Sequence, residues 1–405
     1  MNNISNEELN KYRNDTSGCS GVVHFNNAGA SLPPDVVIDT VVAYLKEEAT
    51  YGGYETEYKN IARIEDTYRL IAELIGAGKD EVAIFENASA AWGTAFKGLT
   101  FEPGDEIITC EMEYVTNLIG LSDVRKKGVK VVVINNDEFG NFPLAELVDA
   151  INPRTKLILV THIPSSGGGI LPINEIGKIA ARYGVLYMVD ACQTAGQYPI
   201  DVKAIQCDIL SATGRKYLRA PRGTGFLFVK KSVQDRLSPI LMDFLAASNV
   251  SLDGYTLRSD ARRFELYEKS RALTLGLGKA VEYALNIGVD RIWQRVQYLA
   301  DLTRSEFSSI PGVTVHDIGS EKCGIVTFSV AGIDSMLVRN KLVEHGINVS
   351  FGGAQATPIY MEKHQLQGIV RASLHYYNTE NEIYSMCSLL KQIAKSDSTA
   401  SVLTE

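Results

Sequence analysis

The sequence lacks several patterns that would define its class at once. Its six cysteines form no CxxC pair and no regular framework; they are Cys19, Cys110, Cys192, Cys207, Cys323 and Cys387. We therefore expect reduced thiols of a cytosolic protein rather than a disulfide scaffold. The six histidines are also scattered, without HExxH or another ligand spacing, so no metal site is predicted.

The chain has neither a basic balance nor a long apolar run. Lys plus Arg total 40 and Asp plus Glu total 48, which gives a net charge of −8. A protein that binds a phosphate backbone is expected to carry a basic balance or stripe, so nucleic acid is not an expected partner. The apolar runs are too short to cross a membrane, and the N-terminus does not resemble a signal peptide. We therefore expect a soluble, cytoplasmic protein without membrane association.

Short β-branched runs alternate with amphipathic stretches through most of the chain. The runs lie at 82–85, 106–109, 130–134, 156–161, 185–190, 208–210 and 225–229. Residues 143–151 and 174–184 have the apolar spacing of helices. This alternation predicts an α/β fold, with a sheet of about seven mostly parallel strands covered on both faces. The hairpin-like segment 222–231 suggests that one strand is antiparallel.

The pattern changes after residue 260. A long helical pattern over 270–310 has one break near 286–290, and strand-like and helical segments then alternate to about residue 394. This predicts a smaller α+β domain. The expected division is an N-terminal arm (1–20), a large domain (21–260), a small C-terminal domain with its linking helix (261–395) and a tail (396–405).

Small and polar residues follow five of the predicted strands. They are Asn87, Ala88 and Ser89; Tyr114 and Asn117; His162 and Ser165; Asp190 and Gln193; and Thr213, Arg215 and Lys216. Because ligands of such sheets bind at the carboxyl ends of the strands, we expect these residues to converge. Arg215 and Lys216 also begin a cluster of four cations with Arg219 and Arg222. We interpret this cluster as a pocket for one anion beside a reactive lysine, in preference to a solvated basic face or a nucleic-acid patch.

The order of these motifs resembles that of fold-type I pyridoxal-phosphate enzymes, and more narrowly the class V aminotransferase and cysteine desulfurase-like superfamily. The motifs are an Ala-Ser turn (88–89), an aromatic residue after Met-Glu (112–114), VDxxQ (189–193) and TGRK (213–216). The resemblance extends from about residue 25 to residue 379. Segments 214–227 and 261–268 are most similar to the branch of hercynylcysteine sulfoxide lyase and isopenicillin N epimerase-like proteins.

This resemblance implies pyridoxal 5'-phosphate as the cofactor and a catalytic set of Lys216, Asp190 and Tyr114. Lys216 would form the Schiff base with the cofactor, Asp190 would face the pyridine nitrogen, and Tyr114 would stack on the ring, where many relatives have His. The phosphate would be held by Ala88, Ser89, Thr213 and Arg215 at a helix N-terminus. Gln193 and Ser165 would contact the phenolic oxygen.

The resemblance also implies substrate-binding residues. Arg371 would hold the substrate α-carboxylate as a bidentate pair. Ala28 and Gly29 would close over the substrate, and Asn117 is a further expected contact. The segment 51–54 is a weaker candidate for the entrance.

The reaction is less defined than the cofactor. Cysteine desulfurases carry a nucleophilic cysteine in a loop that corresponds to 350–368, and this loop has none, which argues against a persulfide-forming desulfurase. We expect C–S cleavage of a cysteine-derived substrate by β-elimination. An amino-acid epimerase, an aminotransferase and a biosynthetic transferase remain alternatives. A non-catalytic cofactor-binding protein is disfavoured, because Lys216 and Asp190 are both present.

The superfamily also implies a homodimer with shared active sites. Residues 245–262 mix Tyr, Arg and apolar side chains, as interfaces do, and are the candidates to reach the phosphate in the partner subunit.

Overall fold

The computed structural model describes residues 4–353 and 355–398 and contains a sheet of seven strands in the order β2-β8-β7-β6-β5-β3-β4. The strands are β2 (Val82–Phe85), β3 (Glu106–Cys110), β4 (Lys130–Ile134), β5 (Thr155–Thr161), β6 (Leu186–Asp190), β7 (Ile209–Thr213) and β8 (Gly225–Val229). Neighbouring strands are parallel, except that β8 is antiparallel to both β2 and β7. The predicted seven-stranded, mostly parallel α/β sheet is confirmed.

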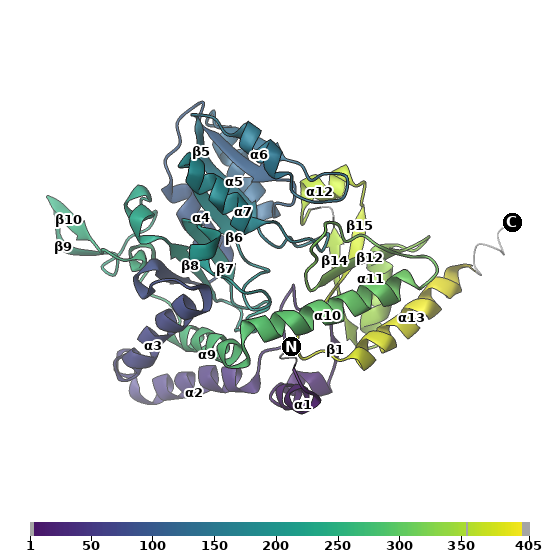
Figure 1. Ribbon diagram of the computed structural model, residues 1–405. Coiled ribbons are helices and arrows are strands. Elements are labelled where there is room, and N and C mark those ends of the chain that lie inside the picture. The colour runs from purple at the N-terminus through teal and green to yellow at the C-terminus, as the bar shows by residue number, and fades with distance from the viewer. Residues whose placement is uncertain (1–3, 354, 399–405) are drawn as a thin grey trace.

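Helices cover both faces of this sheet (Figure 1). On one face, α6 (Leu144–Ala150), α7 (Ile173–Tyr183) and α8 (Val202–Ile205) contribute apolar side chains to the largest core cluster. On the other face, α4 (Ala88–Gly98) and α5 (Val115–Arg125) pack Trp92, Phe96 and Leu121 against the strands. Because both faces are covered, every residue of β6, β7 and β8 is buried, including the polar residues at the ends of β6 and β7.

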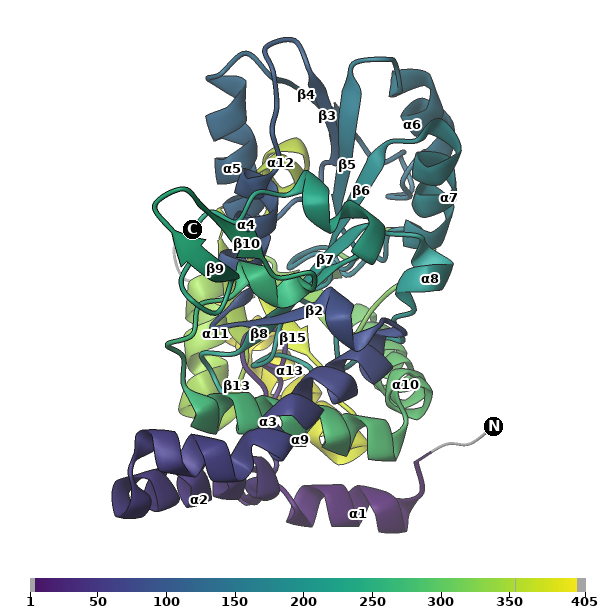
Figure 2. The same ribbon diagram turned by 90° about the vertical axis from the view of Figure 1, so that its left-hand side faces the viewer.

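The residues that precede the sheet form three helices, α1 (Asn6–Asn14), α2 (Asp35–Tyr51) and α3 (Gly53–Ile75). Within the expected arm, α1 begins with a capping box between Ser5 and Glu8 and packs the buried Tyr12 edge-on against Tyr376. The corner between α2 and α3 requires Gly52, whose φ of 98° lies in the left-handed region. Figure 2 shows α1 and α2 together at the base of the molecule.

A smaller four-stranded antiparallel sheet follows, in the order β11-β12-β15-β14, and confirms the predicted C-terminal α+β unit. Its core also holds side chains of α10, α11 and α13. The predicted break in the long helix falls at Gly288 (φ 91°), between α9 and α10. The elements are α9 (Arg271–Ile287), α10 (Val289–Ser308), β11 (Val313–Val315), β12 (Ile325–Val330), α11 (Ser335–Glu344), β14 (Ser350–Gly353), α12 (Pro358–Lys363), β15 (Gly368–Ser373) and α13 (Glu380–Ser398).

Two further strand pairs complete the described structure. β1 (Val23–His24) pairs in parallel with β13 (Ile347–Asn348), which ties the N-terminal segment to the small sheet. β9 (Ala247–Ser251) and β10 (Gly254–Leu257) form an exposed hairpin that extends away from the body at the left of Figure 1. Short 3-10 helices lie at Ser17–Ser20, Lys79–Glu81, Lys231–Arg236 and Ala261–Phe264. Of the expected tail, residues 399–405 lie outside the described residues.

Candidate active site

A pocket opens at the carboxyl edge of the seven-stranded sheet. It gathers the residues predicted from five strand ends, with the exception of His162. The predicted residues that line it are Asn87, Ala88, Ser89, Tyr114, Asn117, Ser165, Asp190, Gln193, Thr213, Arg215 and Lys216. The convergence follows from topology, since the strands that lead into these residues end at one edge.

Lys216 is 9% exposed, three residues beyond the end of β7. The pKa of its ammonium is lowered to about 8, chiefly by burial; the cations Arg215 and Arg371 also lower it, whereas Cys192 and Asp190 raise it. The Lys216 Nζ lies 6.0 Å from the centroid of the Tyr114 ring. A lysine with a pKa near 8 has a substantial neutral fraction, so it can act as a nucleophile and as a base.

Asp190 ends β6 and is 4% exposed. Its Oδ1 accepts a hydrogen bond of 2.9 Å from the backbone N–H of Cys192, and its Oδ2 accepts one of 3.1 Å from Asn117 Nδ2. Asn117 is buried beside Asp190 and bonded to it, which places it as a support for this carboxylate.

The N-terminus of α4 lies at the pocket, where the sequence predicts an anion site. Asn87 caps the helix by accepting a hydrogen bond from the N–H of Ala90, while Ala88 and Ser89 line the pocket at the first turn. Thr213 and Arg215 reach the same pocket from the end of β7. A β-carbon at Gly225 would lie 3.0 Å from the Ala88 nitrogen, so only glycine fits beneath this turn. Helix N–H groups, hydroxyls and a guanidinium together suit a phosphate dianion.

Residues Ala28 and Gly29 approach the pocket from the N-terminal side. The Ala28 carbonyl accepts a hydrogen bond of 3.2 Å from Gln193 Nε2, and the Gly29 carbonyl accepts one from the Arg215 guanidinium. A β-carbon at Gly29 would lie 2.5 Å from Asn26 Oδ1, so a side chain here would require the Asn26 amide to move. The segment 51–54, by contrast, forms the α2–α3 corner and does not line the pocket.

Arg371, on β15 of the small sheet, does not line this pocket but lies close enough to Lys216 for its charge to lower the pKa of that lysine. Its Nη1 donates a 2.9 Å hydrogen bond to the Ser165 carbonyl, and its buried Nε has no hydrogen-bond partner in the described structure. The Ser165 Oγ lies 3.4 Å from Gln193 Nε2. A buried guanidinium with an unused donor is suited to a carboxylate ligand, because leaving it unpaired costs free energy.

Three other residues singled out in the sequence lie outside the pocket. His162 bonds to Thr194 through Nδ1 (3.0 Å), and burial lowers its pKa to about 3, so it is neutral. The Arg219 guanidinium is buried and donates to Leu32 O (2.7 Å), Thr16 Oγ1 (2.6 Å) and the Tyr376 hydroxyl. It therefore holds the N-terminal segment rather than an anion. Arg222 is exposed.

Sequence reasoning missed two polar residues at this site, Glu113 and Cys192. Cys192 lines the pocket between Asp190 and Gln193, and burial raises the pKa of its thiol, an effect that Asp190 increases. Glu113 lies beneath the pocket, fully buried, in contact with Asn117. Glu113 precedes α5, which begins at Val115, so no helical spacing links it to Asn117 in the sequence.

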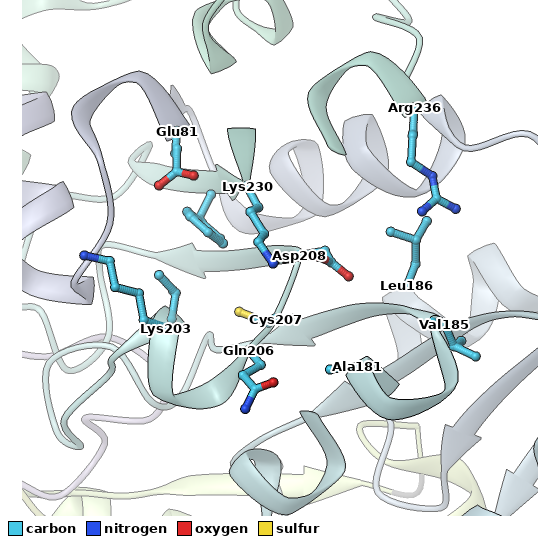
Figure 3. Close-up of a pocket in the computed structure, with 13 residues that line it drawn as sticks. Glu81, Ala181, Val185, Leu186, Lys203, Gln206, Cys207, Asp208, Lys230 and Arg236 are labelled. Atoms are coloured by element: carbon cyan, nitrogen blue, oxygen red, sulfur yellow. Dashed lines mark ion pairs between the residues drawn. The ribbon is translucent and has the colours of Figure 1, made fainter. Parts of the chain in front are cut away.

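A second hollow lies at the opposite edge of the sheet (Figure 3). Its lining includes Lys203, Lys230, Asp208 and Cys207, and the Lys230–Asp208 ion pair spans 3.6 Å. It is built from the amino ends of the strands, which are not where ligands of this type of sheet bind.

Within residues 4–353 and 355–398, no group of His, Cys, Asp or Glu is arranged to hold a metal ion. In the same residues no helix is both long and apolar enough to cross a membrane.

The aminotransferase class-V family matches residues 23–386, and the chain belongs to this family. A protein of Methanothermobacter thermautotrophicus named as a probable cysteine desulfurase is 32% identical over 378 residues, which are 92% of this chain and 94% of the relative. An apo cysteine desulfurase from Thermococcus onnurineus NA1 has a TM-score of 0.90 and 28% identity, covering 96% of this chain and 98% of that structure. The cystine C–S lyase C-DES, in complex with its product cysteine persulfide, has a TM-score of 0.84 at 20% identity and covers 93% and 99% of the two chains.

The fold is therefore that of the fold-type I pyridoxal-phosphate enzymes, as expected. The cofactor of the family is pyridoxal 5'-phosphate, and the pocket fits it. The helix N-terminus beside Arg215 suits its phosphate, and the buried Gln193 Oε1, which lacks a partner in the described residues, faces the same space.

One expectation was wrong, namely that the chain is not a persulfide-forming cysteine desulfurase. Curated relatives and similar structures that span almost the whole chain are named cysteine desulfurases. The expectation rested on one missing thiol in the loop 350–368. That reasoning fails because a persulfide can form on any thiol that reaches the substrate sulfur, so one loop does not decide the chemistry.

Proposed function

We propose that this protein is a pyridoxal-phosphate enzyme that cleaves the C–S bond of cysteine or of a cysteine-derived amino acid. The observation that carries the proposal is the buried Lys216 at the carboxyl edge of the sheet, close enough to Arg371 for the two charges to interact, while the Arg371 Nε has no partner in the described structure. The names of the relatives support cysteine as the substrate class. The similarity of 214–227 and 261–268 to the hercynylcysteine sulfoxide lyase branch supports a substituted cysteine.

Each site residue then has a defined task. Arg371 binds the α-carboxylate, which places the substrate Cα near Lys216. Lys216, with its lowered pKa, removes and returns the proton at Cα. With the cofactor bound, Asp190 would hold the proton on its pyridine nitrogen and Tyr114 would lie against its ring. When bound, the cofactor withdraws electrons from Cα and so makes that proton acidic.

Two balanced outcomes of C–S cleavage are open to this site. In β-elimination, cysteine and water give pyruvate, ammonia and hydrogen sulfide, and an S-substituted cysteine gives the corresponding thiol. In desulfuration, cysteine and an acceptor thiol give alanine and a persulfide, so the sulfur atom moves to the acceptor. In both, the bond that breaks joins Cβ to sulfur.

The test is to incubate the purified holoenzyme with cysteine or S-substituted cysteines, with a thiol present and no keto acid. Sulfur, alanine, pyruvate and ammonia are then quantified together, with K216A as the control. Repeated turnover that releases sulfur supports the proposal, and the ratio of alanine to pyruvate identifies the outcome. Epimerisation without sulfur release would contradict it. So would stoichiometric conversion of the cofactor to its pyridoxamine form, reversed by a keto acid, which is the behaviour of an aminotransferase.

We also propose that the enzyme is a homodimer. Exposed apolar side chains gather on and beside the β9–β10 hairpin, including Leu241, Phe244, Val250 and Leu252. A hairpin with no buried face is marginal in water unless another surface covers it. We propose that a second copy of the chain covers it, because the hairpin lies within 245–262, the segment that the resemblance predicts to reach the phosphate in the partner subunit. Sedimentation should show a dimer that L252E weakens, and a wild-type monomer would contradict the proposal.

A further inference from the structure

Two buried carboxylates, Glu113 and Asp190, share one amide group beneath the cofactor pocket. Asn117 Nδ2 lies 2.7 Å from Glu113 Oε2 and 3.1 Å from Asp190 Oδ2. Glu113, Asn117 and Asp190 are 0%, 1% and 4% exposed. Because an asparagine amide has two N–H groups, it can donate one to each carboxylate. The three side chains therefore form a continuous chain of hydrogen bonds that ends at the pocket.

The remaining bonds of Glu113 suit an ionised carboxylate. Its Oε1 accepts from the Thr161 backbone N–H at 2.7 Å and lies 3.5 Å from Cys110 Sγ, and its Oε2 accepts from Thr161 Oγ1 at 3.0 Å. An ionised carboxylate can accept about four such bonds. All of these donors are neutral, so in the described structure they supply no positive charge to balance Glu113.

The charged and titratable groups that face Glu113 come from several elements. Cys110 lies on β3 and Asp190 lies at the end of β6. Burial raises the pKa of Glu113 to about 7, the bond from Asn117 lowers it, and the charge of Asp190 raises it. A cation placed against Asp190 would favour the ionised form of both carboxylates, and a protonated pyridine ring is such a cation.

Asp190 is fixed at both of its oxygens. Its Oδ1 accepts from the Cys192 N–H and its Oδ2 accepts from Asn117, so the plane of the carboxylate is set from two sides. Asn117 can donate to Asp190 only while its amide nitrogen points that way, and the acceptor Oε2 of Glu113 holds it there.

We propose that Glu113 is a positioning residue, which acts through Asn117 to orient Asp190 and holds a second negative charge behind it, so that the pyridine nitrogen of the cofactor keeps its proton. This inference rests on the cofactor placement in the proposed function, but it does not depend on which amino acid is the substrate. In this arrangement the active site bears a pair of carboxylates on the ring-nitrogen side, of which one contacts the cofactor.

The test reads the ring nitrogen directly. Wild type, E113Q, E113D and the control E111Q are loaded with pyridoxal 5'-phosphate that carries ¹⁵N in the ring, and the ¹⁵N chemical shift is followed against pH. Glu111 is a matched control, because it is also fully buried on the same segment but bonds to Asn136 and Lys363 instead of Asn117. The measurement needs no turnover, so failure of the proposed substrate would not affect it.

In E113Q, the pKa of the ring nitrogen should fall by about one unit, because the substitution removes the negative charge of Glu113 behind the Asp190 carboxylate. E113D keeps the charge and should restore most of this shift, and E111Q should match the wild type. An unchanged profile in folded, loaded E113Q would overturn the inference. If E113Q does not fold, N117A provides the test, because it removes the side chain that links Glu113 to Asp190. The ¹⁵N signal of the ring in N117A should then differ from that of the wild type, and an identical signal would overturn the inference.

Discussion

The role of Arg371 leads to the most specific prediction about substrate binding. The substitution R371M removes the guanidinium and keeps much of the volume of the side chain. Arg371 Nη1 already donates a hydrogen bond to the Ser165 carbonyl, and its buried Nε has no hydrogen-bond partner in the described structure. Two charge-assisted hydrogen bonds to a substrate carboxylate contribute roughly 1.5–3 kcal/mol each. Their loss should therefore lower kcat/KM for cysteine by about 10²–10⁴-fold.

The assay compares cysteine with cysteamine, which lacks the carboxylate. The kcat/KM of R371M should fall by the full 10²–10⁴-fold on cysteine and change little on cysteamine. Cysteamine has no carboxylate, so the interaction that the substitution removes is absent from it. R339M, on α11 of the same small unit, serves as the control and should match the wild type on both. Equal losses on both substrates, with an unchanged melting temperature, would refute carboxylate binding by Arg371.

Three further predictions concern protonation and stability. Cofactor uptake by the apoprotein should accelerate up to about pH 8 and then level off, because burial lowers the pKa of Lys216 to about 8 and the neutral amine is the reactive form; acceleration that continues toward 10.5 would contradict this. E265A should lower the free energy of unfolding by about 3–5 kcal/mol in urea titrations, since it removes the carboxylate that balances the buried charge of Lys269 and leaves only the bond to the Tyr68 hydroxyl; a loss below about 1 kcal/mol would mean that the pair behaves as an exposed one. R219M should speed proteolysis within residues 4–32, because the guanidinium holds Thr16 and Leu32, and unchanged cleavage would argue against that role.

The lowered pKa of Lys216 also predicts a pH-dependent stability of the apoprotein, with a defined sign. The folded pKa of about 8 lies below the ordinary value of 10.5, so the unfolded chain binds the proton more tightly. The penalty on folding is therefore complete below pH 8 and disappears as the pH rises toward 10.5. K216M should be more stable than the wild type at neutral pH, with a difference that shrinks in alkaline urea titrations.

The sequence predicted the sheet well because its strands are buried on both faces. Runs such as 225–229 are apolar throughout, so they are easily assigned as buried strands. The break in the long helix was predicted because a glycine, Gly288, interrupts the helical pattern, and its φ lies in the left-handed region. The β9–β10 hairpin was not predicted as strands, because almost all of its residues are exposed and no apolar periodicity marks it. Its pairing depends on contacts that a periodicity argument does not see.

The sequence predicted the site residues that directly follow strands. It did not predict the contacts between residues that lie far apart in the chain. Lys216 and Asp190 are placed by strand ends, so their positions follow from topology. The bond from Arg371 to Ser165 joins residues 206 positions apart, and the bond that the Thr161 N–H donates to Glu113 joins β5 to the segment after β3. No local pattern encodes these pairs. For the same reason, Asn117 was assigned to the substrate, whereas its amide is used by two carboxylates.

The central claim is that this pocket cleaves C–S bonds by means of Lys216. The most direct measurement is the number of sulfur atoms released per active site when the holoenzyme is given excess cysteine and a reducing thiol. The account predicts many turnovers, with sulfur equal to the sum of alanine and pyruvate, and none in K216A. Sulfur release limited to background, with Cα–H exchange still catalysed on cysteine, would contradict it and would indicate an epimerase or aminotransferase in the same fold.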